Sequence, residues 1–185
     1  MFIDSHCHIN FPELKEKMEE ILSSMEERKI SHALCVSVTL DKFPEIRDLA
    51  GQYKHIFASV GVHPDYEDIN EPTVDQLILL SKDKNVVAIG ETGLDYFRLQ
   101  GDLTWQRDRF RTHIRAAIEA QLPLIIHTRN AREDTIKIMQ EESADKACGV
   151  MHCFTESYEM AKQAIDLGFY ISFSGIITFK NAEEL

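Results

Sequence analysis

Side chains that can bind a metal ion stand at the ends of several short apolar runs. They are His6, His8, Glu91, His127 and His152. Because side chains alternate along a strand, His6 and His8 are expected on one face, about 6 to 7 Å apart. Two imidazoles in that arrangement can bind one divalent cation. Glu91, His127 and His152 each follow a different apolar run, so the set as a whole predicts a metal site.

The apolar runs that precede these residues predict strands. Seven runs have this character, at 2–4, 33–38, 56–62, 86–90, 124–127, 149–152 and 169–173. They alternate with amphipathic stretches such as 14–25, 110–121 and 160–165, and Gly168 is placed to end the last of these helices. This alternation indicates an α/β fold with a parallel sheet, and we predict a TIM (β/α) barrel. The carboxyl ends of barrel strands converge on one face, which would bring the candidate ligands together.

The length of the chain suits a single domain over residues 1–185. A complete eight-stranded barrel takes about 250 residues, and only seven strands are visible in the sequence. We therefore expect a C-terminally incomplete barrel without its eighth βα unit, whose strands one and seven have unpaired edges. Residues 181–185 are expected to begin a helix with Asn181 as its N-cap.

The composition restricts the partners and the compartment. The chain has 31 Asp and Glu against 20 Lys and Arg, a net charge of −11, which disfavours broad attraction to nucleic acid. Bound cations would reverse that sign locally. No secretory signal or membrane-spanning run is visible, and the cysteines form no Cys-x-x-Cys pair or disulfide framework. We expect a cytoplasmic protein with free thiols and no membrane partner.

Several longer segments carry a family resemblance. They are FIDSHCHIN at 2–10, GVHP at 61–64, GETGLDY at 90–96, PLIIHTRNA at 123–131, MHCFT at 151–155 and GIITFK at 175–180. In this order they resemble the motifs of TatD-related deoxyribonucleases, within the amidohydrolase-like metal-dependent hydrolases. The resemblance covers nearly the whole chain. It implies a hydrolase acting on ester bonds, namely a nuclease that cleaves phosphodiester bonds in DNA or in a small phosphodiester.

The resemblance also implies two divalent metal ions. His6 and His8 would hold one ion, His127 and His152 the other, and Glu91 would bridge them as a catalytic group. Paired cations can polarise a phosphodiester and generate hydroxide at neutral pH. The family is generally Mg-dependent, whereas histidine-rich ligands suit Zn or Mn, so the metal stays open. Many amidohydrolase-like relatives have a modified lysine where this chain has Glu91.

Other residues have two interpretations each. His63 either contacts a phosphate or leaving group or is an ordinary loop histidine. Arg129 either clamps a phosphate through two hydrogen bonds or lies on the surface. Asp4 either orients a ligand histidine or accepts backbone amides. Asp95 and Tyr96 are expected to hold the loop after the fourth strand, with no catalytic role. Trp105 and Phe110 are expected to pack helix against barrel, the alternative being that an aromatic ring stacks on a base.

One family feature is missing from the sequence. TatD-like proteins have an aspartate in a Glu-Thr-Asp-Ser-Pro setting at the end of an eighth strand, and this chain has no such segment. Asp65, Asp95 or a second chain would have to supply that ligand. The alternatives to an active nuclease are therefore a catalytically weak metal-binding fragment and a superfamily hydrolase of amide or lactone bonds. Glu91 and the set of motifs disfavour the last of these.

Overall fold

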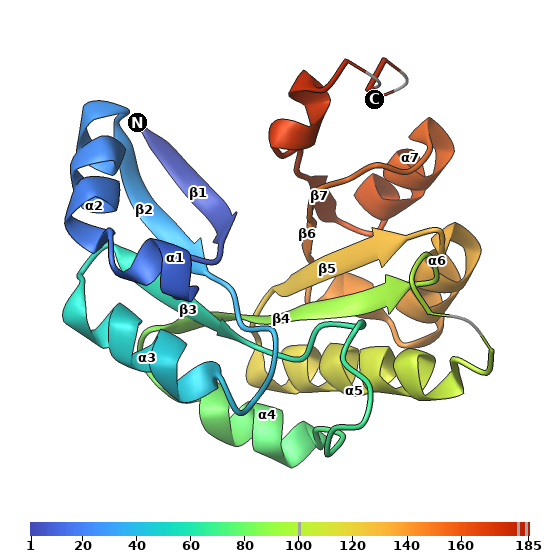
Figure 1. Cartoon of the computed structure of the whole chain (residues 1–185). Coiled ribbons are helices and arrows are strands. Elements are labelled where there is room, and N and C mark those ends of the chain that lie inside the picture. The colour runs from blue at the N-terminus through green and yellow to red at the C-terminus, as the bar shows by residue number, and fades with distance from the viewer. Residues whose placement is uncertain (100, 181, 184) are drawn as a thin grey trace.

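Within residues 1–99, 101–180, 182, 183 and 185, which the computed structural model describes, seven strands form one parallel sheet. They are β1 (Phe2–Cys7), β2 (Ile30–Cys35), β3 (Ile56–Val60), β4 (Val86–Asp95), β5 (Leu124–Arg129), β6 (Gly149–Met151) and β7 (Phe169–Ile171). Each strand pairs with the next along the chain. The sheet curls into an open half-barrel (Figure 1), which confirms the predicted α/β barrel with seven visible strands.

The helices lie on the outer side of the curled sheet (Figure 1). They are α1 (Pro12–Lys15), α2 (Met18–Glu27), α3 (Phe43–Gln52), α4 (Val74–Ser81), α5 (Thr104–Ala120), α6 (Arg132–Glu141) and α7 (Tyr158–Asp166), with 3₁₀ turns η1 (Ala144–Lys146) and η2 (Gly175–Thr178). Thr73 caps α4 through a capping box with Gln76. Gly168 follows α7 with a φ of +82°, which confirms the predicted helix end. None of the described helices is long and apolar enough to cross a membrane.

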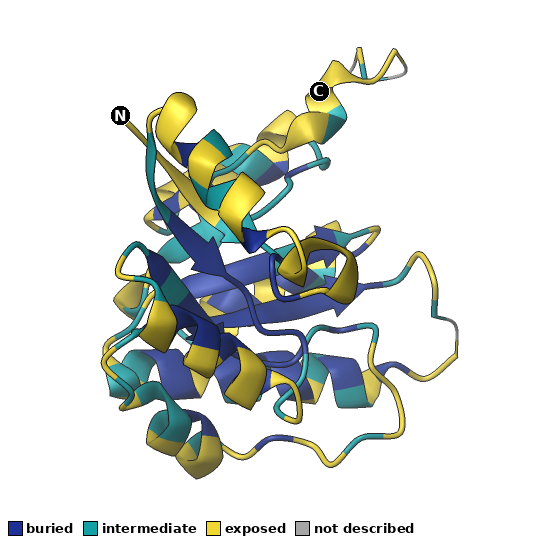
Figure 2. Ribbon diagram, turned by 60° about the vertical axis from the view of Figure 1, so that its left-hand side comes forward, coloured by how far each residue is buried: buried dark blue, intermediate teal, exposed yellow. Residues whose placement is uncertain are grey.

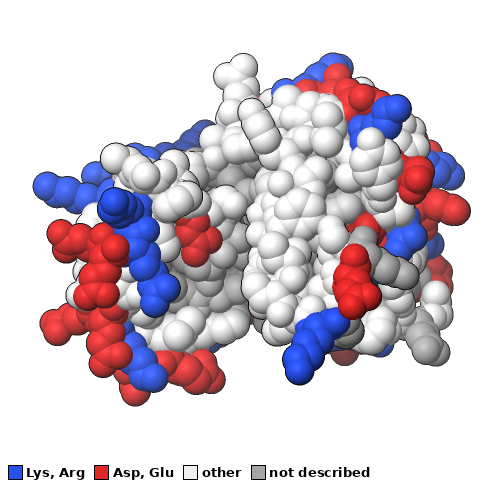
Figure 3. Space-filling model, turned by 90° about the horizontal axis from the view of Figure 1, so that it is seen from above, with Lys and Arg blue, Asp and Glu red and all other residues white. Residues whose placement is uncertain are grey.

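Burial differs between the centre of the sheet and its edges (Figure 2). The core residues of β3, β4 and β5 pack against the helices, as Ile56, Ile89 and Ile126 do with at most 1% exposure. At the edges, Ile3 of β1 is 70% exposed and Tyr170 of β7 is 78% exposed. The described strands include no pairing between β1 and β7, so the predicted open edges are confirmed. Uncharged atoms cover the middle of the face seen from above, with charged side chains around its periphery (Figure 3).

At their carboxyl ends β1 and β4 extend furthest beyond the predicted apolar runs, and β5 extends two residues beyond its run, to Arg129. β1 continues to Cys7, so His6 lies within the strand, and β4 continues past Gly90 to Asp95. In both cases polar residues interrupt the apolar pattern, although the backbone goes on pairing with the neighbouring strand. The cysteines are all free thiols, as expected. The N-cap prediction at Asn181 falls outside the described residues.

Candidate metal centre

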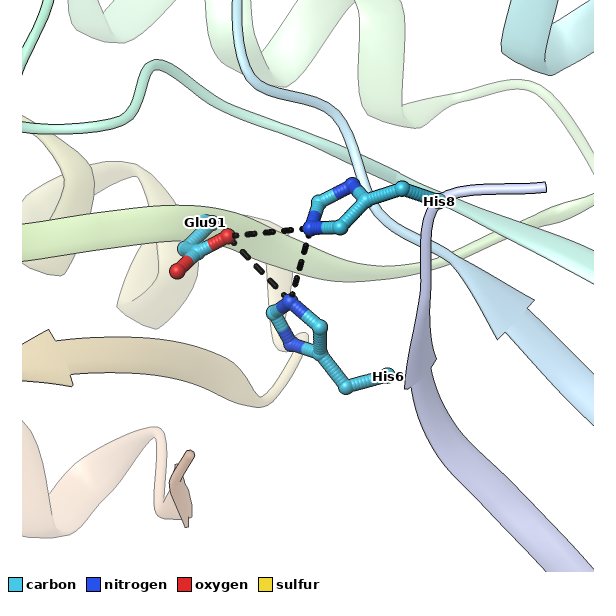
Figure 4. Close-up of side chains that lie close together, drawn as sticks. All are labelled: His6, His8 and Glu91. Carbon is cyan, nitrogen blue, oxygen red and sulfur yellow. Dashed lines mark hydrogen bonds and ion pairs between the residues drawn. The ribbon is translucent and has the colours of Figure 1, made fainter. Parts of the chain in front are cut away.

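Glu91 lies at the middle of the predicted ligands, in the carboxyl-terminal half of β4. It is only 2% exposed. Its Oε2 atom lies 3.2 Å from His6 Nε2 and 3.7 Å from His8 Nε2, and the two histidine Nε2 atoms are 3.2 Å apart (Figure 4). Both imidazoles therefore point to one side of β1, as the alternation of strand side chains predicted.

The other oxygen of Glu91 faces a second set of imidazoles. Oε1 lies 3.3 Å from His152 Nε2, 3.4 Å from His127 Nδ1 and 3.5 Å from His63 Nε2. His152 follows β6, His127 lies within β5, and His63 lies in the loop after β3. The two carboxylate oxygens are thus divided between two histidine groups. We call His6 and His8 the Oε2 group, and His63, His127 and His152 the Oε1 group.

Gly93 in β4 allows these side chains to converge. Gly93 has a φ of +131°, and a Cβ atom built there would lie 1.9 Å from the carbonyl oxygen of His127 on β5. Only glycine fits so close to a neighbouring backbone at a positive φ. This close approach of β4 to β5 lets Glu91, from one strand, meet His127 from the next.

Asp95 contacts His127 from the side opposite to Glu91. His127 Nε2 donates to Asp95 Oδ2 at 3.0 Å, while its Nδ1 faces Glu91. Burial opposes a charged imidazole, but Asp95 and Glu91 outweigh it and raise the pKa of His127 to about 9. The sequence analysis gave Asp95 no catalytic role, and the structure now makes it the partner of a candidate ligand. The signal was available, because residues 91, 93 and 95 share one face of a strand.

Three histidines of the centre, His6, His8 and His63, have lowered pKa values, whereas the Glu91 carboxylate stays charged. Burial lowers the pKa of His6 and His8, and it lowers that of His63 to about 4. Burial disfavours the Glu91 anion, yet hydrogen bonds from His127, His152 and His6 keep the Glu91 pKa well below its ordinary value. Neutral imidazole and ionised carboxylate are the forms that bind metals.

Helix α5 braces the loop that carries His63. His113 Nε2 accepts a hydrogen bond from Val62 N–H at 3.0 Å, and His113 Nδ1 lies 2.8 Å from the Arg109 carbonyl. Arg109 Nη1 donates to the His63 carbonyl at 3.1 Å. His113 is fully buried and Arg109 is 3% exposed, so these bonds are shielded from water and fix the backbone on both sides of His63.

Gln106 extends the same bracing to Asp95. Its Oε1 accepts from the Asp95 amide at 2.9 Å, and its Nε2 donates to the Pro64 carbonyl at 3.1 Å. The sequence analysis missed this polar face of α5, made of Gln106, Arg109 and His113. The spacing of three and then four residues places them on one helical face, which was the available signal.

Arg129 and the aromatic candidates occupy other surroundings. The Arg129 guanidinium lies 3.7 Å from the centre of the Phe97 ring, so its role as a phosphate clamp stays a prediction. Phe110 is fully buried, which confirms it as a core residue. The Trp105 ring lies under the Arg109 guanidinium, with 4.7 Å between the ring centre and the guanidinium carbon. Asp4 Oδ1 accepts from the His6 amide at 3.0 Å, which agrees with the amide-acceptor interpretation.

The donor set fits divalent metal ions. His6, His8 and Glu91 offer three ligand atoms within 4.8 Å of one another, and so do His63, Glu91 and His127. Within the described residues, the buried Nδ1 of His6 has no hydrogen-bond partner, while its Nε2 faces another imidazole nitrogen and a carboxylate. A cation would satisfy such an arrangement of lone pairs better than hydrogen bonds do.

Comparison with known proteins identifies the family. The model of the TatD related DNase family matches residues 3–185. The chain belongs to the TatD family. A metal-dependent hydrolase of Buchnera aphidicola subsp. Acyrthosiphon pisum is 46% identical to this TatD-family chain, over 99% of the chain and 73% of the relative. The metal-dependent hydrolase YcfH of Escherichia coli is 42% identical over 99% of the chain and 70% of the relative.

A solved structure supports the same assignment. The crystal structure of YjjV, a TatD homolog from Escherichia coli, matches with a TM-score of 0.87 and 28% identity, over 96% of this chain and 70% of that one. The TatD-family chain is accordingly a metal-dependent hydrolase with the family's barrel fold, and the histidine and glutamate groups around Glu91 are its candidate metal ligands.

Proposed function

We propose that the protein hydrolyses phosphodiester bonds, with DNA as its substrate class. The observation that carries this proposal is the division of the two Glu91 oxygens between two histidine groups. Such a carboxylate can hold two cations side by side, the arrangement that phosphodiesterases use to stabilise both the attacking and the leaving oxygen. The description of the matching family as TatD related DNase supports the choice of DNA.

The proposed ligand roles follow the two groups. His6 and His8 hold one divalent ion, His127 and His152 hold the second, and Glu91 bridges them. When bound, the ions would polarise the phosphodiester and lower the pKa of a bound water. Mg²⁺ is expected from the family, while the imidazole-rich ligands also suit Zn²⁺ or Mn²⁺.

His63 has a tautomer suited to donating a proton. Its Nδ1 accepts from the Asp65 amide at 3.1 Å, so in the neutral ring the proton is on Nε2, which faces Glu91. We assign to His63 Nε2–H the role of a hydrogen-bond donor to a phosphate or leaving oxygen. Arg129, two residues after His127 in β5, is assigned to bind a phosphate oxygen, for which its guanidinium must leave the Phe97 ring.

The test is hydrolysis by the metal-loaded chain. Protein stripped by a chelator and reloaded separately with Mg²⁺, Mn²⁺ or Zn²⁺ is incubated with an end-labelled single-stranded oligonucleotide, and the products are resolved by length. We expect metal-dependent cleavage that Glu91→Gln abolishes. Cleavage that survives this substitution, or hydrolysis of amide or lactone substrates in place of the oligonucleotide, would contradict the proposal.

A second candidate is a metal-binding protein with weak turnover. It is favoured by one observation: among the described residues, the metal group containing His6 and His8 has Glu91 as its single carboxylate. The same preparation decides between the two, because this candidate binds metal by calorimetry yet cleaves the oligonucleotide no faster than the Glu91→Gln variant.

A further inference from the structure

A cleft opens beside the metal centre, between the start of α1 and the loop after β3. Its volume is about 380 Å³, within the range of sites that bind small molecules. The walls include Phe11 and Tyr66, with Val38 at the apolar side and Asn10, Lys15 and Lys42 at the polar side. Glu16 and Glu45 complete the polar lining, and Glu45 pairs with Lys42 at 3.6 Å.

The two aromatic walls each contact a histidine of the centre. The Phe11 ring stacks on His8, with ring centres 5.0 Å apart and planes inclined by 12°. The Tyr66 ring meets His63 edge-on at 6.4 Å. The cleft therefore adjoins both ligand groups, one aromatic residue at each. A substrate whose scissile bond lies at Glu91 would place the part of the molecule next to that bond against these rings.

The rings keep part of their surface available. Phe11 is 40% exposed and Tyr66 is 39% exposed, although aromatic rings of this size normally bury more when they serve only packing. Exposed rings beside basic side chains are the features that bind unpaired nucleotides, because a base stacks on the ring and a phosphate meets the cation. At this cleft Lys15 supplies a cation, while Lys42 pairs with Glu45 and Glu16 adds a negative charge.

We propose that this cleft is a subsite for the base of one nucleotide next to the scissile phosphodiester, with the base lying against the Phe11 and Tyr66 rings. The proposal rests on the proposed phosphodiesterase function and adds to it a subsite that positions the substrate beside the metal centre.

The test measures binding of a base separately from cleavage. Two labelled hexamers, hexathymidylate and an equally charged hexamer of abasic residues, are titrated with the protein in EDTA and followed by fluorescence anisotropy. We expect the wild-type chain to bind the thymidine hexamer about tenfold more tightly than the abasic one, since stacking on an aromatic ring stabilises each base. Phe11→Leu and Tyr66→Leu should bring this ratio toward one, whereas Phe11→Tyr and Tyr66→Phe, which keep the rings, should preserve it.

A matched control uses an exposed aromatic residue elsewhere. Tyr170 on β7 is 78% exposed, and Tyr170→Leu should leave the ratio unchanged. A wild-type ratio of one, a ratio that survives both leucine variants, or an equal loss in Tyr170→Leu would overturn the subsite. Because EDTA prevents turnover, the two proposals fail separately. Base-dependent binding without metal-dependent cleavage rejects the nuclease alone, and cleavage without base-dependent binding rejects the subsite alone.

Discussion

His6 and His8, the Oε2 group, come from one strand at the open edge of the sheet, whereas the members of the Oε1 group come from three different parts of the chain. β1 exposes 67% of Phe2 and 70% of Ile3, so little packing holds the start of that strand. His8 Nδ1 has one backbone partner, the Val36 carbonyl at 3.2 Å. The geometry of the Oε2 group therefore depends on pairing between β1 and β2 and on two ring contacts, of His8 with Phe11 and of His6 with His152.

The Oε1 group is positioned by contacts that extend well beyond its own strands. His127 is held by Asp95, and the backbone around His63 is held by Arg109 and His113 of α5. Buried hydrogen bonds of this kind fix ligands before any ion binds. The difference indicates that the fold preorganises the Oε1 group, whereas the Oε2 group would rely more on a bound ion to order its side chains.

The largest effect is expected at the residue that both groups share. Glu91→Gln removes the charge that faces all the imidazoles, so both ions should be lost and hydrolysis should fall by about a thousandfold or more. Metal content by atomic emission and the rate of oligonucleotide cleavage measure this. Glu133→Gln, which changes an exposed carboxylate on α6, serves as the control. Unchanged turnover in Glu91→Gln would remove the basis of the comparison.

Removing one ligand from each group tests whether the groups are separate sites. His8→Ala and His127→Ala should each reduce the bound metal from about two ions to about one per chain. The ion that remains should differ in affinity, being tighter in His8→Ala because the Oε1 group stays braced. Isothermal titration with Mn²⁺ measures both numbers. Equal affinities for the remaining ion would show that bracing makes no difference to metal binding.

The carboxylate partner of His127 tests the bracing directly. Asp95→Asn should weaken metal binding at the Oε1 group about 10- to 100-fold. Asp4→Asn, which changes a carboxylate beside His6 of the Oε2 group, should change the affinity of the Oε1 group little. The pH dependence has a definite sign. A ligand imidazole must lose its proton to bind metal, and His127 has a pKa raised to about 9, so metal affinity should rise with pH up to about 9. Asp95→Asn should move this rise to lower pH. Metal titrations between pH 6 and 9.5 measure this shift, and an unshifted profile in Asp95→Asn would contradict the role of Asp95.

The meeting of the candidate ligands around Glu91 could be predicted from the sequence because each of them ends or follows a short apolar run. His6, Glu91, His127 and His152 needed only the rule that parallel strand ends converge. Gln106, Arg109 and His113 were missed for a physical reason. Their partners are backbone atoms at Val62, His63, Pro64 and Asp95, which approach α5 only in the folded chain. A helical polar face shows its spacing in the sequence, but which backbone groups it will meet depends on tertiary packing.

The bracing glutamine should matter for stability as well as for activity. Gln106→Leu leaves the Asp95 amide and the Pro64 carbonyl without their partner in a buried place, and a buried unpaired polar group costs about 1 to 3 kcal/mol. Urea unfolding of the metal-free chain should show this loss. Glu119→Gln, on the exposed face of the same helix, should stay within about 0.5 kcal/mol of wild type. A stable Gln106→Leu protein with normal metal binding would limit the bracing to Arg109 and His113.

The smallest effect is expected from the proton affinity of His113. Burial lowers its pKa to about 4 in the folded chain, while an unfolded histidine titrates near about 6.5. Between these values the unfolded chain binds the extra proton, so stability falls as the pH drops from 6.5 toward 4 and is fully present above 6.5. His113→Gln keeps an acceptor and a donor but cannot titrate. It should therefore reduce the loss of stability between pH 7.5 and 5 by about 1 to 2 kcal/mol. His6, His8 and His63 also have lowered pKa values, but they are common to both proteins. The difference between the two proteins in how the unfolding free energy depends on pH therefore isolates the contribution of His113. Parallel pH profiles would mean that His113 is already protonated in the folded chain at pH 5.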